Sequence, residues 1–109
     1  MPLQFLEFDL SEDSDGLQTW DALASPAAVH TAALLAEVRA LLQHLQQHLG
    51  PSGALDDGHG WDMDLQIQDG SGQPVPLEAG PRPGARITLA LSLSGAGALA
   101  ERLSALGAD

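Results

Sequence analysis

The chain has 109 residues, the size of a single domain, and its hydrophobic fraction of 44% fits a folded protein with one core. Its 15 acidic residues outnumber its 4 basic residues, and the net charge of −11 repels phosphate backbones and anionic membrane surfaces, so we expect neither nucleic-acid nor membrane binding. The absence of cysteine excludes disulfides, thiolate metal sites and cysteine catalysis.

The first predicted element is a strand over residues 3–10, where hydrophobic side chains recur at the two-residue period. Turn formers at residues 11–16 end this strand. These residues have part of the acidic spacing of a calcium-binding loop, but Ser11 and Ala22 stand where the loop needs its first and last carboxylates. We therefore interpret residues 11–16 as an acidic connection to the next element.

A long helix is the next major element. Residues 19–24 predict one helical turn with Trp20 packing inward, and Ser25-Pro26 then forms a helix start, with an N-cap followed by proline. The stop is Gly50-Pro51. Between these signals, one set of side chains falls within an arc of about 120°, which predicts one buried helix face. The set is Leu34, Leu35, Val38, Leu41, Leu42, Leu45 and Leu49. The predicted helix is about 36 Å long, whereas strands of seven or eight residues are about 25 Å long. We therefore expect the last leucines of the helix to extend beyond the sheet.

The second half of the chain predicts two strands and a short helix. In residues 61–68 the odd-numbered side chains are hydrophobic, whereas the even-numbered ones are aspartate or glutamine. Residues 87–93 alternate in the same way, and the glycine- and proline-rich residues 69–85 connect the two strands. Leucines at core spacing in residues 97–106 predict the final helix.

These elements predict an α+β fold, a two-layer βαββα sandwich with a three-stranded antiparallel sheet and two helices on one face. Because the strand at residues 87–93 is uncharged and would promote aggregation at an edge, we place it in the centre, in the order 1-3-2. The arrangement is ferredoxin-like without the last strand, an architectural analogy that implies no function. We expect residues 1–109 to form one domain.

A metal site is one possible function. The rings of His44 and His48, four residues apart on a helix, can share a metal ion. A third ligand would come from Asp56, Asp57 or His59 in the following loop, and such a set suits zinc or another divalent cation. The alternative is that the histidine pair forms only a hydrated helix flank.

Interaction with another protein is the function that the pattern favours. The chain has no nucleophile elbow and no phosphate-binding motif, so a small enzyme ranks third, behind the metal-binding alternative. We expect a small acidic interaction module without catalytic activity or cofactor, which binds a protein partner or associates with itself as a homodimer. The expected contact residues are Phe5, Ala90, Leu45 and Leu49, with Glu7, Asp9 and Asp64 as a charged rim.

The expected location is the cytoplasm. The N-terminal sequence lacks the basic segment and the cleavage site of a secretory signal, and no uncharged run reaches the roughly 20 apolar residues of a membrane helix. The abundance of alanine, leucine and glycine, together with the absence of lysine, is typical of a GC-rich bacterial genome.

Overall fold

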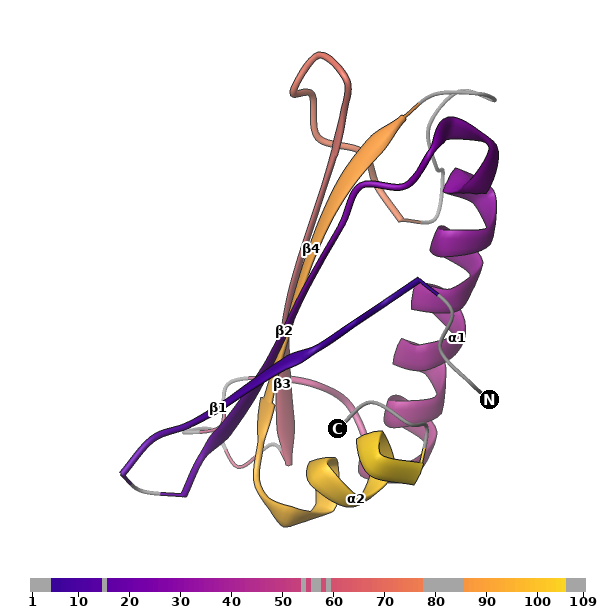
Figure 1. Ribbon diagram of the computed structural model, residues 1–109. Helices are drawn as coiled ribbons and strands as arrows, with labels where there is room; N and C mark the ends of the chain where they lie inside the picture. The colour runs from indigo at the N-terminus through magenta and orange to yellow at the C-terminus, as the bar shows by residue number, and fades with distance from the viewer. Residues whose placement is uncertain are drawn as a thin grey trace.

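In the part of the chain that the structure describes, the fold is a four-stranded antiparallel sheet in the order β1-β2-β4-β3, with both helices on one of its faces (Figure 1). The predicted α+β class is confirmed, but the sheet has one strand more than predicted: β2 lies between β1 and β4, and the three predicted strands keep their relative order. The computed structural model describes residues 5–14, 16–53, 55, 58, 60–77 and 86–105. The elements are β1 (Asp9–Glu12), β2 (Gln18–Ala24), α1 (Thr31–Leu49), β3 (Trp61–Asp69), β4 (Ile87–Gly95) and α2 (Gly97–Ala105).

The additional strand is β2, where the sequence predicted a helical turn. Trp20, Ala22 and Ala24 are buried, whereas Asp21 and Leu23 between them are exposed. Every residue of β2 pairs with β4. The prediction was wrong because alanine has little preference for strands, and here pairing with a central hydrophobic strand outweighs that local preference.

The N-terminal segment lies on α1 and does not form the predicted strand. The backbone N–H groups of Phe5 and Leu6 both donate to Oε2 of Glu37 on the helix, each at 2.9 Å. The first strand therefore starts later than predicted, at Asp9, and residues 3 and 4 lie outside the described residues. The Glu37 carboxylate therefore accepts the backbone hydrogen bonds that the carbonyl groups of a neighbouring strand would otherwise accept.

The acidic segment after β1 closes a hairpin between β1 and β2. Asp13 accepts a hydrogen bond from the N–H of Leu17 through its side chain, and its own N–H donates to the Leu17 carbonyl, both at 2.9 Å. Because Gln18 pairs with Gly95, this turn lies at the end of the sheet opposite Arg86.

The Ser25-Pro26 pair marks the end of β2 and does not cap the helix. The Ser25 hydroxyl donates to the carbonyl of Ile87 at 3.3 Å, and the Arg86 guanidinium donates to the carbonyls of both Ser25 and Pro26. A short 3-10 turn precedes α1, which starts at Thr31, later than predicted. The predicted end of the helix at Leu49 is confirmed.

The core fills the space between the sheet and the two helices. The predicted central position of the uncharged strand is confirmed, because β4 lies between β2 and β3 with all its odd-numbered residues buried. The predicted overhang of α1 is wrong: Leu45 is fully buried and Leu49 is half-buried. The helix is shorter than predicted, and α2 packs against it and against β4. No helix in the described ranges is long and apolar enough to cross a membrane.

Candidate interaction face

A row of acidic side chains crosses the sheet on the face turned away from the helices. The strand register pairs Asp9 with Asp21, Asp21 with Ser92, and Ser92 with Asp64. Directly paired residues project from the same face of a sheet. Three aspartates and one serine, one from each strand, therefore form a continuous line, which we call the aspartate row.

Hydroxyl groups support this row. The Ser92 hydroxyl donates to Oδ1 of Asp21, which fixes the central carboxylate beside β4. In the neighbouring row the hydroxyls of Thr19 and Ser94 lie 3.4 Å apart. Asp62 pairs with Ser94 and adds a further carboxylate to this face. The surface around the aspartate row is therefore polar and rich in small side chains.

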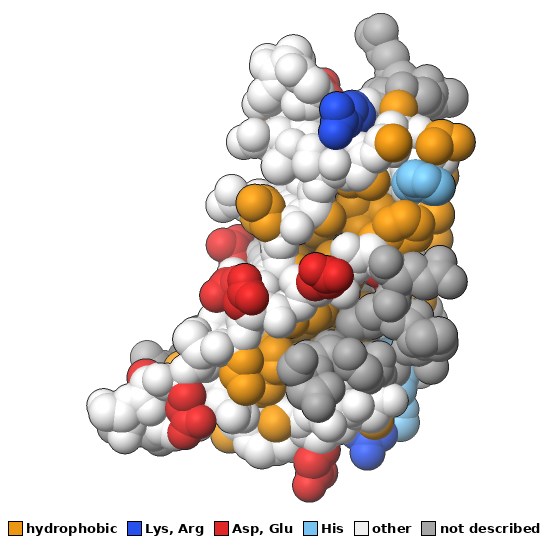
Figure 2. Space-filling view, in the orientation of Figure 1, with side chains coloured by type: hydrophobic (Ala, Val, Ile, Leu, Met, Phe, Trp, Pro, Cys, Tyr) orange, Lys and Arg blue, Asp and Glu red, His pale blue; other side chains and the backbone are white. Residues whose placement is uncertain are grey.

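The remainder of the face is neutral. Leu23 is 74% exposed and stands opposite Ala90, which in turn pairs with Gln66. No basic residue is among the side chains that the register of the four strands places on this face. In Figure 2, acidic side chains are spaced along the sheet side of the molecule, and basic side chains are seen only near its two ends. The face therefore combines negative charge with one exposed apolar contact.

Three of the predicted contact residues lie together on this face, namely Asp9, Asp64 and Ala90. Asp21 and Ser92 complete the row, and neither was among the predicted contact residues. The alternation of buried and exposed residues within β2 was the signal that could have identified Asp21.

The other predicted contact residues lie elsewhere. The ring of Phe5 is centred 5.6 Å from the ring of His30, next to α1, so Phe5 does not lie beside Ala90. Leu45 is buried in the core and cannot contact a partner, and half-buried Leu49 packs against the core. Glu7 is exposed but precedes the first strand. The predicted leucine surface is therefore absent from the described part of the molecule.

The histidine pair lies at the C-terminal end of α1. The ring centroids of His44 and His48 are 4.4 Å apart, and Nη1 of Arg102 lies 3.5 Å from Nδ1 of His48. The pKa of His44 is lowered, first because burial penalises the charged ring and then because His48 and Arg102 are nearby. The described residues include no group of three or more side chains that could hold a metal ion. The predicted ligands Asp56, Asp57 and His59 lie outside the described residues.

The comparisons with known proteins gave no relative. The chain matches no protein-family model, no curated protein and no solved structure.

Proposed function

We propose that the protein is a small acidic interaction module, without catalytic activity, whose open sheet face binds the basic surface of a partner protein. The observation that carries this proposal is the aspartate row formed by Asp9, Asp21, Ser92 and Asp64 across all four strands. Lysine and arginine side chains of a partner would pair with its carboxylates, and exposed Leu23 would add an apolar contact.

The geometry of the face supports docking of another flat or convex surface. Strands lie about 4.8 Å apart, so neighbouring carboxylates of the row are spaced at distances that several basic side chains can span together. The surrounding serine, threonine and alanine side chains project little above the sheet. A net charge of −11 also accelerates the encounter with a positively charged partner at low ionic strength.

The charge of the face disfavours a homodimer that uses the same surface. A two-fold dimer through this face would bring the aspartate row of one copy against that of the other. Like charges directly opposite one another are destabilising. The leucine surface expected to support self-association is not exposed, because Leu45 is buried. We therefore propose a partner protein of opposite charge and not a second copy.

Divalent-metal binding by His44 and His48 is a second candidate, favoured by one observation. Nε2 of His44 is buried and has no hydrogen-bond partner in the described structure. The nearby positive charge of Arg102 opposes a bound cation. A titration with zinc chloride, followed by the ring resonances of both histidines, tests this candidate. Unchanged resonances at a zinc excess would eliminate it.

The interaction proposal is tested by NMR with a basic probe of defined sequence. Titration of the ¹⁵N-labelled protein with a lysine-glycine decapeptide should shift the amides of Asp9, Asp21, Asp64 and Ser92 more than those of acidic residues elsewhere. A glutamate-glycine decapeptide of equal length serves as the control and should shift none of them. Shifts spread evenly over all exposed acids would contradict a specific binding face.

A further inference from the structure

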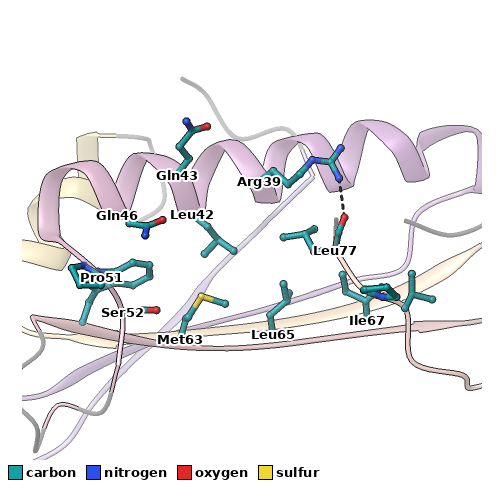
Figure 3. Close-up of a pocket in the computed structure, with 13 residues that line it drawn as sticks. Arg39, Leu42, Gln43, Gln46, Pro51, Ser52, Met63, Leu65, Ile67 and Leu77 are labelled. Atoms are coloured by element: carbon teal, nitrogen blue, oxygen red, sulfur yellow. Dashed lines mark hydrogen bonds between the residues drawn. The ribbon is translucent and has the colours of Figure 1, made fainter. Parts of the chain in front are cut away.

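A groove lies between α1 and β3, on the opposite side of the sheet from the aspartate row (Figure 3). Its volume is about 620 Å³. The side chains of Leu42 from the helix and of Met63 and Leu65 from the strand point toward one another across it. Gln43 and Gln46 contribute polar groups from the helix. The groove therefore combines an apolar floor with a polar rim.

One wall of this groove is the free edge of the sheet. β3 pairs with β4 on one side only. On its other side, the Trp61 carbonyl accepts from Gly53 and the Ile67 carbonyl accepts from Val75, at 3.2 Å and 2.8 Å. Because backbone groups alternate in direction along a strand, Leu65 directs both its N–H and its carbonyl toward this edge. Neither group has a partner there among the described residues.

Among the described residues that follow β3, only those of one short stretch pair with its edge. Gln68 forms an isolated antiparallel bridge with Pro74, and Val75 donates to Ile67. Pro76 then has no N–H with which to continue this pairing. The carbonyl of Leu77 accepts a hydrogen bond from Arg39, so the chain turns toward the helix. Within the described residues, no strand therefore lies beside the middle of β3.

Arg39 gives the groove a charge opposite to that of the whole chain. It is the only charged side chain lining the groove among the described residues, although the net charge of the protein is −11. Its Nη1 donates to the Leu77 carbonyl at 3.0 Å, which leaves other guanidinium donors for a ligand. Arg39 is exposed at the mouth of the groove, where it favours a carboxylate.

We propose that this groove binds an extended peptide segment of a partner, which adds to β3 as a fifth strand. Addition of a strand to a free sheet edge supplies backbone hydrogen bonds, and pockets for alternate side chains supply specificity. The peptide pairs with both backbone groups of Leu65, directs alternate apolar side chains between Leu42 and Met63, and places a carboxylate at Arg39. This site is separate from the aspartate row and does not depend on its function.

The free strand edge favours a peptide over a fatty acid as the ligand. Both ligands can provide apolar groups and a carboxylate, but only a peptide backbone satisfies the N–H and the carbonyl of Leu65 together. Binding of a peptide should therefore slow hydrogen exchange at the Leu65 amide, whereas a fatty acid would leave it unprotected.

The test uses four heptapeptides with free C-terminal carboxylates, in which threonine alternates with valine, leucine, isoleucine or phenylalanine. NMR titration to about 1 mM detects even weak complexes. At least one peptide should shift the amides of Met63, Leu65 and Ile67 and protect the Leu65 amide from exchange. The same peptide with N-methylated central residues should lose binding, and decanoate should neither compete with it nor protect Leu65.

Substitution of Arg39 tests the role of its charge. Arg39→Gln should weaken the carboxylate peptide by about threefold to tenfold and leave the C-terminally amidated peptide unaffected. Arg102→Gln makes the same charge change away from the groove and should alter neither affinity. The proposal is overturned if no peptide shifts Leu65, if the N-methylated form binds equally well, or if decanoate binds and the peptides do not.

Discussion

Replacing Asp21 with asparagine removes a negative charge from the aspartate row while retaining an oxygen that accepts the Ser92 hydrogen bond. Asp9 lies directly opposite Asp21 on the neighbouring strand, and Asp64 lies two strands away. The strand spacing implies charge separations of about 5 Å and about 10 Å. Because both neighbours are negative, we expect Asp21→Asn to stabilise the fold.

The magnitude follows from these separations. In water, the repulsion is about 0.8 kcal/mol at 5 Å and about 0.4 kcal/mol at 10 Å before screening. Screening reduces the sum to about 1.0 kcal/mol at 0.01 M salt and about 0.6 kcal/mol at 0.15 M salt. For a domain of this size, each kcal/mol corresponds to a rise in Tm of about 4–8 °C.

Urea unfolding followed by tryptophan fluorescence measures this effect, because Trp20 and Trp61 are only 2% and 1% exposed. The free energy of unfolding should be higher for Asp21→Asn, and the difference should shrink as salt is added. Glu101→Gln on α2 makes the same change in net charge and should have a much smaller effect. A loss of stability in Asp21→Asn, or an equal gain in both variants, would contradict charge repulsion within the aspartate row.

Three further predictions concern the fold. Gly95→Ala should lower the free energy of unfolding by about 1–3 kcal/mol in urea titrations, because the new Cβ would lie 2.9 Å from Cδ2 of Leu99. Glu37→Ala should cost about 1–3 kcal/mol and accelerate amide exchange at Phe5, because it removes a charged acceptor from the N-terminal segment. The pKa of His44 lies below its ordinary value of 6.5, so the unfolded chain binds more protons, and stability should fall as the pH drops below 6.5. In thermal melts, the His44→Gln variant should show a weaker dependence of stability on pH. If its pH profile equals that of the unsubstituted protein, His44 is not the source of the dependence.

The sequence was sufficient to predict the elements whose pattern is strong and local. The alternation of apolar and polar residues identified β3 and β4, and Gly50 with Pro51 identified the end of α1. The uncharged character of β4 also predicted its central position. These patterns are sufficient to predict the elements because the spacing of apolar residues within each element identifies the face that it buries.

The elements that were missed depend on partners distant in the sequence. β2 is rich in alanine, which local preference assigns to helices, and its strand form depends on pairing with β4. The N-terminal segment alternates like a strand, but Glu37 binds its backbone instead. Because β2 was missed, Asp21 was missed too, and the sequence alone could predict only the outer members of the aspartate row.

The affinity of a basic probe for two matched triple variants shows whether the aspartate row is a binding face. One variant carries Asp9→Asn, Asp21→Asn and Asp64→Asn, and the other replaces exposed acids outside the aspartate row, with Glu7→Gln, Glu12→Gln and Glu101→Gln. Both variants lose the same net charge. Calorimetric titration with the lysine-glycine decapeptide should show an affinity about tenfold lower for the first variant than for the second, since three exposed charge pairs of up to about 1 kcal/mol each are lost. Equal affinities would show that only the net charge matters and would contradict a binding face at the aspartate row.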